Sequence, residues 1–198
     1  MISSRNRALD GAAAAAIAIV VAMAGPALAL EPAEVLSGLA RVERSDATFE
    51  ETRHIAALTA PVIRRGTLRY VRPADLEMVV QTPVAERVRV SGTTLTIEGR
   101  NGVREVRLAD MPAIAGWVES VRATLAGDAP ALARHFTVRA SGDVSRWQLD
   151  LTPLSTELAA FVTRVTISGA NAQIGRIDVI EASGDRSEMV VSPVRGKP

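Results

Sequence analysis

Residues 66–80 read GTLRYVRPADLEMVV, and this stretch decides the fold. Before Pro73, the apolar residues Leu68 and Tyr70 alternate with Thr67 and Arg69. After Pro73, every second residue is again apolar: Leu76, Met78 and Val80. Side chains two residues apart in a strand point to the same face of the sheet. The stretch therefore predicts two antiparallel strands joined by a short turn, with one apolar and one polar face.

The same alternation recurs along most of the chain. Its apolar members are Val88 and Val90; Leu95 and Ile97; Val106 and Leu108; Trp147, Leu149 and Leu151; and Phe161, Val165 and Ile167. Turn dipeptides such as Ser91-Gly92 and Ser183-Gly184 separate these segments. The pattern predicts roughly ten to eleven strands. A twisted sheet of that size curls, so we predict an α+β fold whose single antiparallel sheet forms an open half-barrel.

Helical periodicity interrupts the strands in three places. Pro32 suits a first helical turn, and an apolar stripe follows at Val35, Leu36, Leu39 and Val42. In mid-chain, Asp110 can cap a helix that Pro112 opens and Gly127 ends. The apolar stripe of that helix is Ile114, Trp117, Val118, Val121 and Leu125. A second short helix is expected to start near Asp128, with Leu132 facing inward, and a further helical turn between 153 and 160 carries Leu154 and Leu158.

These helices have no second sheet against which to pack, so they must cover the concave apolar face of the one sheet. Two interpretations stay open at this point. The helices could seal the face as an ordinary core, or they could form a lid over a cavity.

The first 29 residues have the pattern of an export signal. Arg5 and Arg7 precede an apolar stretch at 11–24, and the small residues Ala27 and Ala29 form a cleavage site. We predict a signal peptide at 1–29, cleaved after Ala29, and one domain at 30–198. The alternative is a retained anchor, for which the apolar stretch is short of the roughly 20 residues that a spanning helix needs.

Composition argues against several functions. The formal net charge is +1 and aromatic residues make up 3% of the chain, so we expect no nucleic-acid partner. With 0 cysteines, a disulfide framework or a thiolate metal site cannot form. His54 and His135 lack the spacing of a metal or catalytic motif. We therefore predict no catalytic residue, no metal site and no cofactor.

Two pairs of adjacent charged residues, Glu50-Glu51 and Arg64-Arg65, are more simply explained as strand residues than as a binding or catalytic site. Adjacent residues of a strand point to opposite faces, so the two carboxylates cannot share a site. The arginines are predicted to form part of a solvated surface.

Four segments, in this order, resemble the LolA/LolB family of lipoprotein carriers, and a LolA-related branch more than LolA itself. They are Phe49-Glu50-Glu51, residues 66–76 with their Gly-x-Leu and Arg-Pro elements, Thr82-Pro83, and residues 90–95. The resemblance implies a periplasmic carrier that shuttles acyl-bearing cargo from an inner-membrane donor to an outer-membrane acceptor. We expect it to act as a monomer.

The resemblance also implies roles for particular residues. The acyl cavity would be lined by Leu68, Tyr70, Leu76, Met78, Val80, Val88, Val90, Leu95, Ile97, Trp147 and Leu149. The lid helix would contribute Ile114, Trp117, Val118 and Val121. Arg72, which the alternation places on the face of Leu68 and Tyr70, would hold the lid closed through helix-end carbonyls. The plainer alternative is an arginine at a strand end that reaches solvent.

Other functions are compatible with the same pattern. The cargo could be a free lipid or glycolipid instead of a lipoprotein, because the lining is aliphatic where LolA is often aromatic. A sensor of mislocalised lipoprotein, or a structural envelope protein with a sealed core, would share the fold. An enzyme is disfavoured by the missing catalytic motifs.

Overall fold

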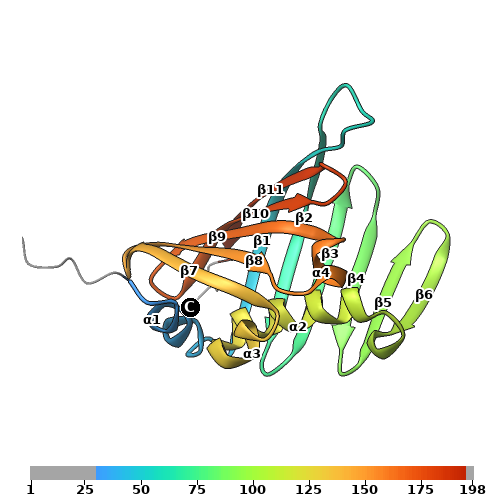
Figure 1. Cartoon of the computed structure of the whole chain (residues 1–198). Helices are drawn as coiled ribbons and strands as arrows, with labels where there is room; N and C mark the ends of the chain where they lie inside the picture. The colour runs from blue at the N-terminus through green and yellow to red at the C-terminus, as the bar shows by residue number, and fades with distance from the viewer. Residues whose placement is uncertain (1–29, 195–198) are drawn as a thin grey trace, which may run out of the picture.

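The computed structural model describes residues 30–194, which form one antiparallel sheet with helices on one face (Figure 1). Its strands are β1 (Arg44–His54), β2 (Val62–Val71), β3 (Asp75–Thr82), β4 (Glu86–Ser91), β5 (Thr94–Gly99), β6 (Gly102–Arg107), β7 (Phe136–Asp143), β8 (Arg146–Pro153), β9 (Val162–Ala170), β10 (Gln173–Glu181) and β11 (Arg186–Pro193). Its helices are α1 (Pro32–Leu39), η1 (Leu108–Asp110), α2 (Pro112–Ala126), α3 (Ala129–Ala133) and α4 (Thr156–Ala159). The predicted fold class is confirmed.

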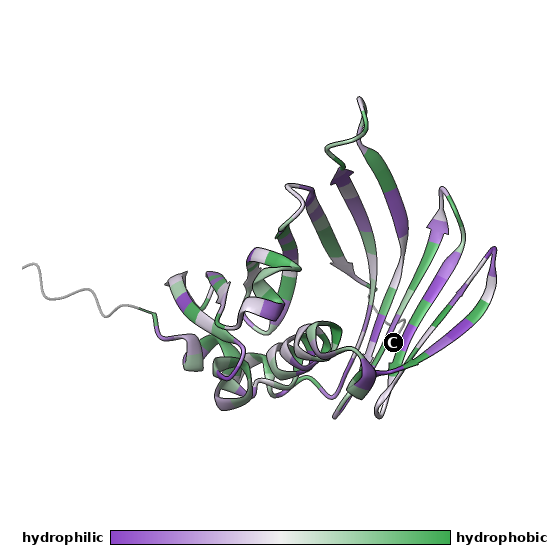
Figure 2. Ribbon diagram, turned by 45° about the vertical axis from the view of Figure 1, so that its right-hand side comes forward, coloured by the Kyte–Doolittle hydropathy of each residue, from purple (hydrophilic) through white to green (hydrophobic). Residues whose placement is uncertain are grey.

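The sheet has the order β6-β5-β4-β3-β2-β1-β11-β10-β9-β8-β7. Two meanders, β1–β6 and β7–β11, thus meet where the first strand pairs with the last, and α2 and α3 connect their outer edges. Figure 2 shows the sheet curling around the helices. The helices lie together at one end of the concave face, whereas the β1–β2 loop extends away at the opposite end (Figure 1).

Local sequence accounts for the helix boundaries. Proline occupies the first turn of α1, α2 and α3, where a missing N–H costs no intrahelical bond. Gly127 ends α2 in a left-handed conformation with φ 70, as the sequence predicts. The Asp128 carboxylate accepts a hydrogen bond from the Ala131 backbone N–H and so caps α3.

Three local predictions were wrong. Asp110 does not cap α2: it lies in η1 and its carboxylate accepts a hydrogen bond from the Arg107 Nε. Val42 lies beyond the end of α1. Phe161 is exposed, because the register of β9 against β10 shifts at Ile180/Glu181 and brings Val162 into the core instead.

Within residues 30–194, no helix is long and apolar enough to span a bilayer, and no three His, Asp or Glu side chains are grouped as metal ligands would be.

Candidate functional site

The predicted lining residues of β2–β5 form two continuous rows on the concave face. One row joins Leu68, Met78, Val88 and Ile97 through successive strand pairs. The other joins Tyr70, Leu76, Val90 and Leu95 in the same way. The second row lies nearer the helices and contains three buried side chains, whereas every member of the first row is half-buried.

Trp147 and Leu149 lie on β8, in the other meander. Their exposed fractions are 1% and 0%, and they belong to a large cluster that α1, α2 and α3 cover. The smaller cluster contains Val90, Leu95, Leu108 and Val118. The structure therefore places the β8 pair in the larger, more deeply sealed core, apart from Val90 and Leu95 in the smaller one.

The α2 helix spans both cores. Val118 is buried in the smaller cluster, with Ile114 packed against it. Trp117 packs on the larger cluster and meets Phe161 edge-on, with ring centroids 6.4 Å apart. Val121, which follows them along α2, is half-buried. Because α2 rests directly on both clusters, the structure represents a closed arrangement of the predicted lid.

Arg72 lies in the turn after β2 and reaches the end of α1. Its Nη1 donates a hydrogen bond to the Ala40 carbonyl, at the C-terminal end of that helix. Its Nε lies 3.9 Å from a Glu43 carboxylate oxygen. The helix-end carbonyl that Arg72 contacts belongs to α1 and not to the mid-chain helix, so its role as a latch stays a prediction.

A second arginine, which sequence reasoning missed, holds α2 to the sheet. Arg122 donates from Nε to the Ala74 carbonyl at 2.9 Å and from Nη2 to the Gly92 carbonyl at 2.7 Å. These carbonyls lie in the β2–β3 and β4–β5 turns. The available signal was that Arg122 is the single basic residue of α2 and directly follows the apolar Val121.

The charged pairs do not both lie on a solvated surface. Arg65 and Glu50 form an exposed ion pair of 2.7 Å. Arg64 instead lies on the concave face, 3.0 Å from Glu51, which is 5% exposed and accepts a hydrogen bond from the Ser187 hydroxyl. The alternation contained this information: Glu51 lies two residues from the buried Phe49, and Arg64 two from Gly66.

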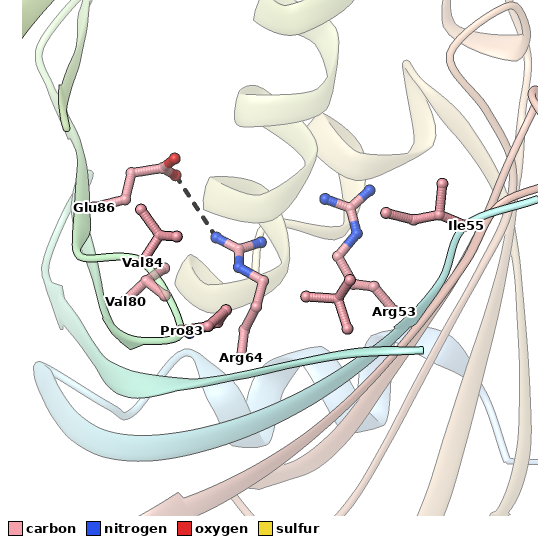
Figure 3. Close-up of a pocket in the computed structure, with 8 residues that line it drawn as sticks. Arg53, Ile55, Arg64, Val80, Pro83, Val84 and Glu86 are labelled. Atoms are coloured by element: carbon pink, nitrogen blue, oxygen red, sulfur yellow. Dashed lines mark ion pairs between the residues drawn. The ribbon is translucent and has the colours of Figure 1, made fainter. Parts of the chain in front are cut away.

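Two pockets lie at the margins of the helix-covered face. One has a volume of about 270 Å³ and is lined by Arg53, Ile55, Val62, Arg64, Val80, Pro83, Val84 and Glu86 (Figure 3). The other, of about 440 Å³, lies between α1, α3 and β7 and includes Leu36, Phe136 and Leu154. Leu154, which belongs with Leu158 to the predicted helical turn at 153–160, is 57% exposed. Of the predicted lining residues, Val80 reaches the first pocket.

A family model described as outer membrane lipoprotein carrier protein LolA-like matches residues 24–194. The chain belongs to this LolA-like family. The resemblance in its motifs is thereby confirmed, and with it membership of a family described as LolA-like lipoprotein carriers. No curated protein sequence matches the LolA-like chain.

Several solved structures resemble the chain at low sequence identity. A LolA superfamily protein from Nitrosomonas europaea is 12% identical, with a TM-score of 0.46 over 86% of this chain and 96% of that chain. Lipoprotein LppX from Mycobacterium tuberculosis is 9% identical, with a TM-score of 0.43 over 83% and 97%. A putative outer membrane lipoprotein-sorting protein domain from Vibrio parahaemolyticus is 11% identical, with a TM-score of 0.43 over 86% and 94%.

Proposed function

We propose that this chain is a non-enzymatic periplasmic carrier that binds the acyl chains of lipoproteins or lipids on the concave face of its sheet and shuttles them toward the outer membrane. One observation carries the proposal. The aliphatic row of Leu68, Met78, Val88 and Ile97 runs unbroken across four strands and is only half-buried. An unbroken apolar row with part of its surface accessible is suited to hydrocarbon.

The energetics of carriage require a competing closed state. Burial of hydrocarbon contributes about 0.8 kcal/mol per methylene, so a chain of roughly 16 carbons could gain on the order of 10 kcal/mol. That gain suffices for transport but opposes release. A closed state in which the protein's own side chains occupy the cargo's place offsets part of it, so closing and cargo binding become one coupled equilibrium.

The helices supply such a closed state. Val118 of α2 occupies the apolar surface formed by Val90 and Leu95, and Arg122 holds the helix to two turns of the sheet. Arg72 holds α1 in the same region. In the proposed cycle, cargo displaces α2 from the smaller cluster, and return of the helix assists delivery.

Replacement of Arg72 tests the latch. An Arg72→Leu variant loses the hydrogen bond to Ala40, so closure is weakened and bound cargo is retained. We expect it to load normally and to fail in transfer to acceptor membranes, measured with radiolabelled lipid. Arg69→Leu, on the polar face of β2, is the matched control, since Arg69 pairs with Asp46 away from the helices. Transfer by Arg72→Leu at the wild-type rate would remove Arg72 from the mechanism.

The cargo is best identified on the native protein. Extraction of the purified periplasmic protein with organic solvent, followed by mass spectrometry, distinguishes a free lipid or glycolipid from an acylated peptide. The aliphatic character of the lining supports a free lipid as the second candidate for the cargo. Recovery of no lipid, together with no uptake from vesicles, would overturn the carrier proposal.

The proposed location depends on the export signal. Residues 1–29 and the cleavage site after Ala29 lie outside the described residues. Cell fractionation and N-terminal sequencing of the recovered protein test it: we expect a periplasmic chain that begins at Leu30. The inner-membrane donor and outer-membrane acceptor would then be sought by crosslinking in intact cells.

A further inference from the structure

Two arginines interrupt the apolar concave face near the end from which the β1–β2 loop extends (Figure 1). Arg53 of β1 and Arg64 of β2 lie on adjacent strands, where Arg53 pairs with Val62 and Glu51 with Arg64. Both side chains point into the pocket of about 270 Å³ (Figure 3). Two positive charges on the concave face of an apolar-binding sheet require an explanation beyond the binding of hydrocarbon.

Carboxylates hold both guanidinium groups in place. The Arg53 Nη2 lies 2.7 Å from Glu181, and the Arg64 Nη1 lies 3.0 Å from Glu51. Glu51 is itself fixed by the Ser187 hydroxyl. An arginine held by a neighbouring group loses less side-chain entropy when it binds a ligand, so these contacts prepare the pocket for binding.

Both arginines keep donors for a ligand. A guanidinium has five N–H donors in a planar fork. Within residues 30–194, the buried Arg53 Nε has no hydrogen-bond partner. Arg64 has a second carboxylate neighbour, Glu86, but that contact is 3.6 Å, longer than a hydrogen bond, and Glu86 is 41% exposed at the rim. Glu86 can therefore give way to a competing anion.

The pocket has the size and walls expected for the head of an amphiphile. Its volume of about 270 Å³ lies just below the roughly 300–1,000 Å³ typical of pockets that enclose a whole small ligand. Apolar side chains form the rest of its wall: Ile55, Val62, Val80, Pro83 and Val84. Val80 is two residues from Met78 on the same face of β3, so the pocket lies beside the Met78 position of the proposed acyl row.

We propose that Arg53 and Arg64 bind the anionic head group of the cargo, a phosphate or carboxylate attached to the acyl chains that lie along the Met78 row. This inference rests on the proposed carrier function and specifies the chemical class of its cargo. Guanidinium groups bind such oxyanions in bidentate fashion, and the apolar walls strengthen the attraction by excluding water. Bound head group replaces Glu86 beside Arg64.

The test compares lipids that differ only in the head group. The full-length mature protein is incubated with phosphatidylcholine vesicles that contain either phosphatidic acid or diacylglycerol with identical chains, and protein-bound lipid is quantified by mass spectrometry. A second pair, palmitic acid and its methyl ester, separates a carboxylate from a phosphate. We expect the anionic member of at least one pair to bind in preference.

Three variants assign the preference to the pocket. Arg53→Gln should lower it by about tenfold, the usual effect of losing a hydrogen bond to a charged group. Glu86→Gln should raise it, because a competing carboxylate is removed. Arg65→Gln is the matched control: Arg65 is next to Arg64 in sequence and also pairs with a glutamate, but lies on the opposite face. Circular dichroism verifies the fold of each variant.

The outcomes separate this inference from the carrier proposal. If neither lipid of either pair binds, the carrier function fails. If charged and neutral lipids bind equally, or Arg53→Gln and Arg65→Gln have the same effect, the carrier function stands and the head-group site is overturned.

Discussion

Tyr70 reports on the closed state at the scale of a single residue. It is the only tyrosine of the chain, 3% exposed, and burial raises the pKa of its phenol above the usual value, partly countered by the nearby Arg72 charge. The folded protein thus favours the neutral phenol. The associated stability is complete below the unfolded-state pKa of about 10 and is lost as the pH rises through the higher folded-state pKa.

A spectroscopic pH titration of the protein tests whether the pKa of Tyr70 is raised. We expect phenolate absorbance to appear at higher pH in the folded protein than in urea. The Arg72→Leu variant separates the two opposing influences: without its positive charge, the pKa of Tyr70 should rise further. Equal midpoints in folded and unfolded protein would show that the Tyr70 hydroxyl is accessible to water.

Residue-scale prediction from sequence succeeded wherever alternation alone decides orientation. It assigned Met78 and Glu77 to opposite faces correctly. It missed Glu51, Arg53 and Arg64 because charged residues were expected to be exposed. Glu51 and Arg53 are an even number of residues from Phe49, and Arg64 is two from Gly66, so strand alternation places all three on the concave face. Their burial depends on partners such as Ser187, which lies 136 positions from Glu51 in sequence and cannot be paired with it from one chain alone.

At the scale of elements, Gly127 fixes the contact between α1 and α2. A Cβ added at this position would lie 2.2 Å from the Leu36 carbonyl oxygen and 2.5 Å from the Ala40 Cβ, and the residue has φ +70. Gly127→Ala should destabilise the fold by more than about 1 kcal/mol, since backbone strain and a clash combine. Gly184→Ala is the control: φ is +89 with nothing within 4 Å of the added Cβ, so it measures backbone strain alone. Urea denaturation of both variants gives the difference in their free energies of unfolding. Equal losses of stability would mean that α1 shifts to accommodate the added Cβ without destabilising the fold.

Arg122 provides the second test at this scale. Arg122→Ala removes two hydrogen bonds between α2 and the turns at Ala74 and Gly92, each worth about 1.5 kcal/mol or more because the donor is charged. A weaker closed state leaves more of the protein competent to bind, so apparent affinity for a fluorescent fatty acid should rise by about tenfold while thermal stability falls. General structural damage would lower affinity instead. Arg134→Ala, exposed just after α3, is the control.

The elements themselves were more predictable than their junctions. Alternation and turn dipeptides predicted the strands, and proline and glycine predicted both ends of α2. The error at Asp110 arose because η1 inserts an extra turn before α2. The error at Phe161 arose from a register shift between β9 and β10. Both features depend on neighbouring strands and leave no local sequence signal.

For the whole molecule, the two cores under one sheet differ greatly in size. The larger contains fifteen buried residues drawn from α1, α2, α3, α4 and the β7–β9 strands, whereas the smaller contains Val90, Leu95, Leu108 and Val118. Local opening follows the route of least buried contact. The molecule should therefore open between α2 and β3–β5 while α3 and β7–β9 stay assembled. Sequence periodicity alone did not distinguish the two apolar clusters.

Hydrogen exchange with mass spectrometry tests this asymmetry. In the lipid-free protein, amides near Val118 should exchange faster than those of β8 and β9, because fewer buried contacts must separate. Loading with lipid should speed exchange at 112–118, where the helix loses its apolar partner, and slow it in β3–β5, where acyl chains cover the strands. Leu149 and its neighbours should not change. If lipid slowed exchange uniformly, cargo would bind to the closed molecule. If exchange became faster in β8, the larger core would open as well. Either result would exclude opening by movement of α2 alone.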